Sequence, residues 1–289
     1  MDRNFKFIFF GTPKFASIVL EELIASDYVP IAVICNPDRP VGRKKTVTPP
    51  PVKILAKKHG IQILQPETLT DYQLSAASYK PNLAIVASYS KILPKEIMES
   101  FPLGAIGVHP SLLPKYRGAS PIQTVILNGE TETGVTLFLM DEKVDRGPVI
   151  TQEKIKIDAD EAYPELHDRL ATLGGKLLVK ILPDFLKEKL KPQEQNHAEA
   201  TMTKKFKTED GFVAPELLKQ AQEGGGEIAR EIFNKIRALG AEPGVWTITK
   251  EKRMRIRAAH LESDGRLKIT VIQAEGKKPG GLDKNKVLS

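Results

Sequence analysis

The sequence contains a single cysteine, Cys35, which lies inside the apolar stretch IAVICN. One cysteine cannot form an internal disulfide, and cysteine-based metal sites use several thiolates. We therefore expect Cys35 to be a buried apolar residue. No group of histidine, cysteine and carboxylate residues has metal-ligand spacing, and we expect no metal site.

Long hydrophobic runs are also missing, since none approaches the roughly 20 residues that span a membrane. The N-terminus, MDRNFKFIFFGTP, lacks the pattern of a signal peptide and is typical of a first β-strand. GTPKFA follows that strand without the second and third glycines of the dinucleotide fingerprint, and there is no Walker A sequence. These absences predict a cytoplasmic protein that binds neither membranes nor nicotinamide dinucleotides.

Positive charge is unevenly distributed over the 289 residues, of which 41% are hydrophobic and 27% charged. Residues 1–190 contain 24 Lys and Arg against 22 Asp and Glu, whereas residues 191–289 contain 19 against 14. The smaller C-terminal part thus carries most of the formal net charge of +7. This excess favours a polyanionic partner, above all a nucleic acid.

The first part of the chain alternates between continuous apolar runs and segments with helical spacing. Continuous apolar strands separated by helices predict a parallel α/β sheet with both faces covered. The expected strands are residues 5–10, 30–36, 61–64, 81–90 and 105–109. TGVTLFLM and PVITQEKIKI, joined by the polar turn DEKVDRG, predict a hairpin-like excursion, and a long helix is expected over residues 161–190.

Residues 191–205 show almost no apolar periodicity, and we interpret them as a linker. We therefore expect a catalytic domain over 1–190 and a second domain over 206–289. A helix near 227–239 followed by VWTIT, RMRIRAA and LKITVIQ predicts a small β-barrel. Within it, arginines alternate with apolar residues at Arg253, Arg255 and Arg257, so one strand face presents a row of arginines. Such a row suits a phosphate backbone or a solvated outer face.

His109 ends the apolar run AIGVH and is the candidate catalytic residue. Ligands of open parallel sheets bind beyond the carboxyl ends of the strands, where the expected strand 105–109 places it. Asp145, in the tip of the later hairpin, could reach back to the same edge. A carboxylate beside an imidazole orients the ring and favours its protonated form. From the residues alone, a structural histidine remains the alternative.

Two loops have the character of binding segments. NPDRPVGRKK, residues 36–45, is a basic loop that either contacts an anion or is merely exposed. SYSKILP, residues 88–94, is a polar-to-apolar turn at a strand end and can offer backbone groups to a flat polar ring.

Several motifs, in order along the chain, resemble those of formyltransferases that use 10-formyltetrahydrofolate. They are HPSLLPKYRGASPIQ and VDRGPVI. GTPKFA, NPDRPVGR with TPPPVK, LQPETL, KTEDG, KIRALGAEPGVWT and AEGKKP resemble the methionyl-tRNA formyltransferases within this family. The resemblance implies a Rossmann-like N-terminal domain, a linker and an OB-like barrel. It implies transfer of a formyl group from 10-formyltetrahydrofolate to the α-amine of methionyl-initiator-tRNA, by a protein that we expect to be a monomer.

The resemblance also implies roles for particular residues. His109 and Asp145 match the catalytic histidine and aspartate, and position 107 belongs to the same catalytic motif. The residues expected to bind the folate are Ser88, Tyr89, Ser90, Ile92, Leu93, Pro94, Ser111, Leu112, Leu113 and Pro114. The residues expected to bind the tRNA are Arg39, Arg43, Lys44, Lys45, Lys115, Arg117, Lys207, Arg253 and Arg255.

The chain departs from the family pattern at Gly107, because the pattern is Asn-x-His and this sequence has Gly107-Val108-His109. The asparagine amide is expected to help bind the developing oxyanion, and losing such a donor costs on the order of 100–1000-fold in rate. Three interpretations stay open: an impaired enzyme or one with another donor, a non-catalytic binder of tRNA or folate, and a glycine introduced by mutation. Formyl transfer to a small amine, such as a sugar nucleotide or glycinamide nucleotide, is a further alternative.

Overall fold

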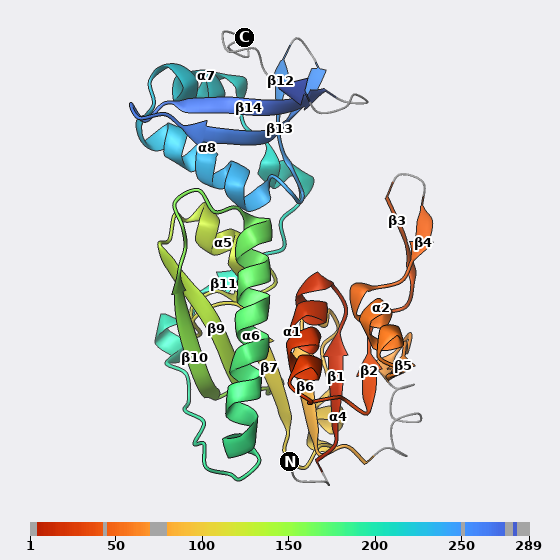
Figure 1. The fold of residues 1–289 in the computed structure, drawn as a ribbon. Coiled ribbons are helices and arrows are strands. Elements are labelled where there is room, and N and C mark those ends of the chain that lie inside the picture. The colour runs from red at the N-terminus through yellow and green to blue at the C-terminus, as the bar shows by residue number, and fades with distance from the viewer. Residues whose placement is uncertain (1–4, 43–44, 70–79, 250–251, 275–279, 282–289) are drawn as a thin grey trace. The chain divides into compact units, whose positions relative to one another are not determined.

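A computed structural model describes residues 5–42, 45–69, 80–249, 252–274 and 280–281 (Figure 1). Its internal contacts divide the chain into two compact units. The first comprises Met1–Arg117, Gly134–Lys154 and Asp168–Met202, and the second comprises Gly118–Thr133, Ile155–His167 and Thr203–Ser289. The expected division at residues 190 and 205 differs in detail and stays a prediction.

The first unit is built on a seven-stranded sheet with the strand order β10-β9-β7-β6-β1-β2-β5. Its strands are β1 Phe7–Gly11, β2 Ala32–Ile34, β5 Gln62–Leu64, β6 Leu83–Ala87, β7 Ala105–His109, β9 Glu132–Leu139 and β10 Val149–Lys156. The five strands from β7 to β5 are parallel, and β9 runs antiparallel to β7. The predicted parallel α/β sheet is thus confirmed. β2 and β5 lie on one side of β1, and β6 and β7 lie on the other, so the strand order reverses at β1.

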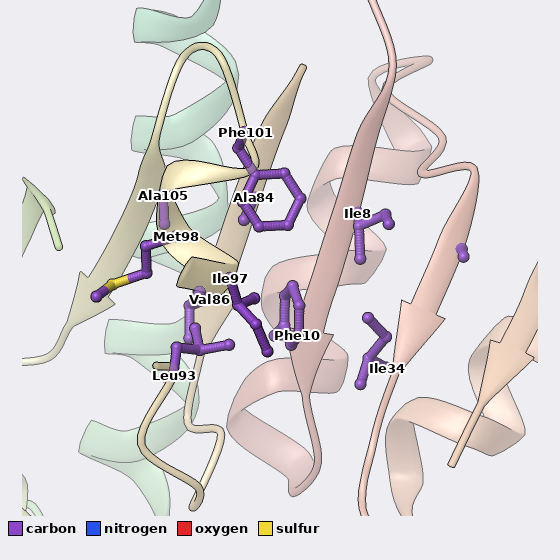
Figure 2. Packing of buried hydrophobic residues seen from close by; sticks show 11 residues of the cluster. Ile8, Phe10, Ile34, Ala84, Val86, Leu93, Ile97, Met98, Phe101 and Ala105 are labelled. Carbon is purple, nitrogen blue, oxygen red and sulfur yellow. The ribbon is translucent and has the colours of Figure 1, made fainter. Parts of the chain in front are cut away.

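Both faces of this sheet are buried, which explains why its strands have continuous apolar sequences. β1, β6 and β7 are buried along their whole length. On one face, alternate strand residues pack against the segment around α4, Lys95–Glu99 (Figure 2). The cluster consists of Ile8, Phe10, Ala32, Ile34, Ala84, Val86, Leu93, Ile97, Met98, Phe101 and Ala105. Burial of this kind stabilises the fold by about 25 cal/mol per Å² of apolar surface.

Two long helices, α1 Lys14–Ala25 and α6 Tyr163–Phe185, approach closely through a glycine pair in α6. A Cβ built on Gly174 would lie 2.8 Å from Val108 Cγ1 in β7, and one on Gly175 would lie 2.9 Å from Glu22 Cγ in α1. Larger residues would therefore push α6 away from the sheet. A third helix, α2, covers Pro51–Lys58.

Several short elements complete the description of the chain. An antiparallel ribbon is formed by β3, Arg39–Val41, and β4, Thr46–Thr48, where only a loop was predicted. β8, Arg117–Gly118, pairs with β11, Met202–Thr203. Two 3-10 helices cover His197–Glu199 (η1) and Thr208–Gly211 (η2).

The second unit contains an antiparallel sheet with the order β12-β13-β14-β15. Its strands are Val245–Thr249, Lys252–Leu261, Leu267–Ala274 and Gly280–Gly281. The helices are α5 Pro121–Leu127, α7 Pro215–Glu223 and α8 Gly226–Leu239, and α8 packs against β13 and β14. The predicted β segments and the helix near 227–239 are confirmed. Closure of the sheet into an OB-like barrel stays a prediction.

Candidate functional site

The carboxyl ends of four neighbouring parallel strands bring the predicted site segments together in the first unit. Gly11 pairs with Ala87, and Ala87 pairs with Val108. The next residues along these strands, Thr12, Ser88 and His109, therefore stand in one row. Asn36, beyond β2, joins this row because its backbone N–H donates to Thr12 Oγ1 at 3.2 Å.

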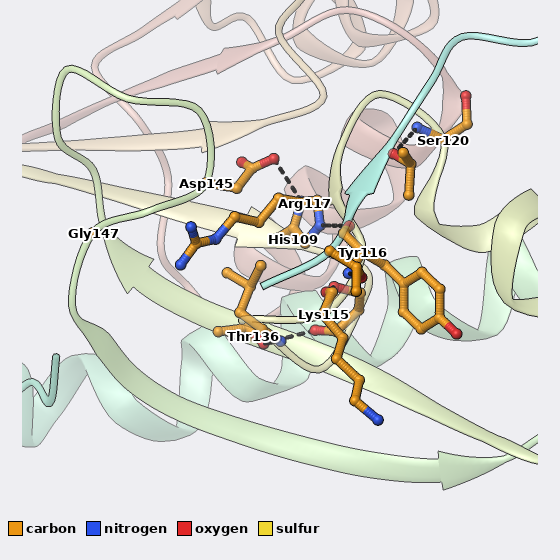
Figure 3. A network of polar contacts seen from close by, with 12 residues as sticks. His109, Lys115, Tyr116, Arg117, Ser120, Thr136, Asp145 and Gly147 are labelled. Atoms are coloured by element: carbon orange, nitrogen blue, oxygen red, sulfur yellow. Dashed lines mark hydrogen bonds and ion pairs between the residues drawn. The ribbon is translucent and has the colours of Figure 1, made fainter. Parts of the chain in front are cut away.

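His109 is held at both ring nitrogens (Figure 3). Nε2 lies 2.9 Å from the carbonyl oxygen of Tyr116, and Nδ1 lies 3.5 Å from Asp145 Oδ2. The His109 side chain is 7% exposed and that of Asp145 is 20% exposed. A carbonyl oxygen only accepts hydrogen bonds, so Nε2 donates to it, and an imidazolium can donate to both oxygens at once. The predicted approach of Asp145 to His109 is thus present.

Both partners of His109 are in the left-handed backbone region, with φ of 49° at Asp145 and 60° at Tyr116. Non-glycine residues seldom adopt this conformation, which costs roughly 1–3 kcal/mol and persists where the surroundings enforce it. Two residues after Asp145, Gly147 passes so close to the backbone of Leu139 that a Cβ would overlap it. The loop 141–147 is thus shaped by close backbone packing.

Gly107 lies beside the ring of Phe138, its partner in the pairing of β7 with β9. A Cβ built on Gly107 would lie 2.6 Å from Phe138 Cζ, and closer still to Cε1. Because Phe138 is only 3% exposed, its ring cannot swing into solvent without uncovering the core. The Phe138 ring thus fills the space that a side chain at position 107 would need, and glycine, which has no side chain, leaves room for the ring.

Hydrogen bonds to Lys115 and Thr136 hold the segment from Ser111 to Pro114 in place. Ser111 Oγ donates to the Lys115 carbonyl at 2.7 Å, and Thr136 Oγ1 donates to the Ser111 carbonyl at 2.6 Å. Thr136 also accepts from the backbone N–H of Leu113 at 3.1 Å. Ser111 and Leu113 are buried, while Leu112 and Pro114 are half-buried. The segment therefore presents Leu112 and Pro114 to a ligand more readily than Ser111.

The segment 88–94 combines exposed and buried residues. Ser88 has φ of 47°, and Ile92 is 74% exposed, whereas Leu93 belongs to the core. Tyr89 packs edge-on against Phe10, and burial raises the pKa of its hydroxyl to about 12. The Tyr89 hydroxyl and Asn36 Oδ1 are buried without a hydrogen-bond partner, and the Asn36 amide nitrogen donates to Ser90 Oγ at 2.8 Å.

The basic residues predicted to bind tRNA differ in their environments. Arg39, Lys45, Lys115, Lys207 and Arg253 are exposed, and Arg43 and Lys44 lie outside the described residues.

Two of the predicted arginines are engaged within the protein. Arg117 is buried, and its guanidinium donates to Gln195 Oε1. Arg255 donates to the carbonyls of Ala241 and Pro243, each at 3.2 Å. Arg253, by contrast, stacks on the Trp246 ring at 4.0 Å and stays accessible. The role of each residue in binding tRNA stays a prediction.

Three residues that surround His109 and Asp145 were not found from the sequence: Tyr116, Thr136 and Gln195. Thr136 pairs with His109 across β7 and β9, so the strand register could have indicated it. Tyr116 acts through its backbone carbonyl, and Gln195 lies in the expected linker. Neither has a signal in the sequence.

Within the described ranges, no group of three His, Cys, Asp or Glu residues is placed to hold a metal ion. In that same part of the chain, no helix is long and apolar enough to cross a membrane.

Comparison with known proteins gives matches over both parts of the chain. The family model described as formyl transferase matches residues 3–182, and that of the formyl transferase C-terminal domain matches residues 227–275. The methionyl-tRNA formyltransferase of Staphylococcus epidermidis is 42% identical over 89% of this chain and 80% of its own length. That of Listeria innocua is 43% identical over the same shares of the two chains.

Solved structures support the fold. The methionyl-tRNA formyltransferase from Clostridium thermocellum has a TM-score of 0.59 at 18% identity, covering 93% of this chain and 98% of its own. An N-formyltransferase from Helicobacter canadensis, in complex with folinic acid and dTDP-3-aminofucose, has a TM-score of 0.62 at 23% identity, covering 89% and 88%. The family matches and the curated relatives together lead to one conclusion: this chain belongs to the formyl transferase family.

Proposed function

We propose that this protein transfers a formyl group from 10-formyltetrahydrofolate to the α-amine of methionine on initiator tRNA. The curated relatives near 40% identity are methionyl-tRNA formyltransferases, and the likeness runs over about nine-tenths of the chain. The observation that carries the proposal is the His109–Asp145 pair at the carboxyl edge of the family's sheet. Charged tRNA is used in the cytoplasm, so this function implies a cytoplasmic protein. We propose that it acts as a monomer without a metal.

The folate co-substrate fits the polar groups at the strand ends. The Tyr89 hydroxyl, within the segment 88–94, and Asn36 Oδ1, whose amide nitrogen donates to Ser90 of that segment, are buried polar atoms without partners. Such atoms are costly unless a ligand or water completes their hydrogen bonds, and a polar heterocycle provides donors and acceptors for this purpose. Ile92 is exposed and Leu112 is half-buried, so both can offer apolar surface to a ligand.

His109 is the group on this chain that can move the proton in the reaction. 10-Formyltetrahydrofolate supplies the formyl carbon. The methionyl nitrogen forms the new C–N bond and loses one proton, and the departing nitrogen gains one. His109 can carry this proton at Nε2 when substrate replaces the Tyr116 carbonyl at that nitrogen, while Asp145 holds Nδ1. Its N–H can also stabilise negative charge that develops on the formyl oxygen, a role expected of the side chain that Gly107 lacks.

The basic residues provide the affinity for tRNA in this proposal. Arg39, Lys45 and Lys115 are exposed in the first unit, and Lys207 and Arg253 are exposed in the second. Each phosphate that they neutralise releases counterions, so binding should weaken steeply as salt rises.

The test is formation of formylmethionyl-tRNA from 10-formyltetrahydrofolate and methionyl-initiator-tRNA, with methionyl-elongator-tRNA and an amino-sugar nucleotide as competing acceptors. We expect methionyl-initiator-tRNA to be formylated fastest. The His109→Ala variant should lose most of the rate of formyl transfer. Transfer to the amino-sugar nucleotide alone would identify a small-amine formyltransferase. Tight binding of both ligands with no transfer would identify a non-catalytic protein.

A further inference from the structure

The segment after α6 passes through the candidate active site before it reaches the second unit. Residues 193–201 contact the loop that carries Asp145 and the loop that carries Tyr116, all within the first unit. These two loops supply both partners of His109. We call residues 193–201 the clamp segment.

Two residues of the clamp segment join the two loops. His197 lies near an arginine in each, with Arg146 Nε at 3.2 Å and Arg117 Nη2 at 3.0 Å. Gln195 joins them through four hydrogen bonds. Its amide nitrogen donates to the carbonyls of Asp145 at 3.1 Å and Gly147 at 2.7 Å. Its oxygen accepts from Arg117 Nε at 3.1 Å and Nη2 at 2.5 Å. Two donors and two lone pairs are all in use, so this buried amide is fully satisfied.

The backbone holds Gln195 in place from both sides. Gln193 exchanges two hydrogen bonds with Val149, at 2.7 and 2.8 Å, where β10 begins. Thr201 accepts from the backbone N–H of Tyr116 through its hydroxyl at 2.8 Å, and from that of Arg117 through its carbonyl at 2.9 Å. The clamp segment thus fixes the position of the Tyr116 carbonyl as well.

We propose that Gln195 is a positioning residue for catalysis, which acts by holding Asp145 in the geometry that faces His109. The left-handed backbone conformation at Asp145 is energetically unfavourable for a non-glycine residue. Contacts from outside the loop must therefore stabilise it. Gln195 supplies that restraint through the carbonyls of Asp145 and Gly147. Without these two hydrogen bonds the loop is held less tightly, so the carboxylate should face the imidazole for a smaller fraction of the time.

The test compares three single variants. Gln195→Ala removes the amide, and Gln195→Glu keeps its size and its contact with Arg117 but replaces the donating nitrogen. Gln193→Ala removes a nearby amide whose side chain is exposed, and serves as the matched control. Misplacement of a reacting group by 1 Å can cost about 100-fold in rate. We therefore expect both Gln195 variants to lower kcat by about 10- to 100-fold with little change in KM, and the control to match the unchanged protein.

A double-mutant cycle distinguishes positioning from general destabilisation. In the Asp145→Asn background, where the carboxylate is already lost, Gln195→Ala should lower kcat by less than about threefold, because both changes remove the same interaction. An equal loss of rate in both backgrounds would overturn the proposal. So would an unchanged kcat in Gln195→Ala and Gln195→Glu.

Hydrogen exchange provides a readout that needs no substrate. Amides of residues 141–147 should exchange faster in both Gln195 variants than in the Gln193→Ala control, and unchanged exchange would refute the restraint. The kinetic part rests on the proposed formyl transfer, whereas the exchange part does not. If the unchanged protein transfers no formyl group, the proposed function fails and hydrogen exchange alone decides whether Gln195 holds the loop.

Discussion

Replacing Gly107 by asparagine is expected to destabilise the protein without raising its activity. The family pattern places an amide donor at position 107, so the single substitution is the obvious way to restore one. The Phe138 ring occupies the space that the new side chain needs, because a Cβ at position 107 would lie 2.6 Å from Phe138 Cζ. Ordinary carbon–carbon contacts are about 3.5–4.0 Å long.

The size of the effect follows from overpacking. Forcing extra atoms into a well-packed core costs about 1–3 kcal/mol. A buried amide left without a partner adds about 1–3 kcal/mol more. Since 1 kcal/mol shifts Tm by about 2–4 °C in a chain of 150–250 residues, the variant should melt several degrees lower. Differential scanning calorimetry measures this shift.

The compensating change is Phe138→Leu, which removes Cε1 and Cζ but keeps an aliphatic side chain. The double variant Gly107→Asn/Phe138→Leu should regain most of the lost Tm. If the asparagine then donates to the developing oxyanion, formyl transfer should rise by about 100- to 1000-fold over the unchanged protein. Phe138→Leu alone is the control, because it relieves the packing without adding a donor and should not raise the rate.

Two results would refute this reasoning. A Gly107→Asn variant as stable as the unchanged protein would mean that Phe138 does not occupy the space. A stable double variant with an unchanged rate of formyl transfer would mean that the active site does not lack a donor, and that His109 or another group already binds the oxyanion.

Three further predictions follow from the site and its surroundings. Asp145→Asn should lower kcat by about 100-fold or more in the formylation assay, because general acid–base groups contribute about 10²–10⁴ in rate; a change below threefold would contradict the role of the carboxylate. Arg253→Ala should weaken tRNA binding and reduce the slope of log K against log salt by about one. Arg255→Ala should mainly lower Tm, because the variant loses the hydrogen bonds to two backbone carbonyls. Equal slopes for the two variants in filter-binding titrations would contradict this contrast. Cys35 should resist thiol reagents at pH 8 until the protein unfolds, since burial raises the pKa of its thiol to about 11; rapid labelling of the native protein would show that the thiol is accessible.

The sheet could be predicted because its strands leave a strong trace in the sequence. β1, β6 and β7 are buried on both faces, so FIFFG, LAIVA and AIGVH are continuous apolar runs. The short helices α5 and α7 leave a weaker trace, as each has only a few turns. The strands β3 and β4 are only three residues long and fully exposed, and so short a pattern could not be distinguished from a loop.

The site was predictable only in part. His109 and Asp145 carry side chains whose chemistry is visible in the sequence, and the expected topology allowed Asp145 to reach His109 without requiring it. The contact of Phe138 with Gly107 depends on the register of β7 against β9, which no local pattern determines. The contribution of Tyr116 is a backbone carbonyl, and residue type gives no indication of it.

The order in which the chain is made bears on when this site can form. The sheet and the loop carrying Asp145 are complete before residue 190, but the Gln195 amide and the Thr201 backbone that restrain the two loops come later. During synthesis, the nascent first unit can therefore bury its core while the Gln195 and Thr201 hydrogen bonds to these two loops are still missing. A recombinant fragment cut at residue 190 would keep the strands and omit the restraint, whereas one extended to Met202 would include it.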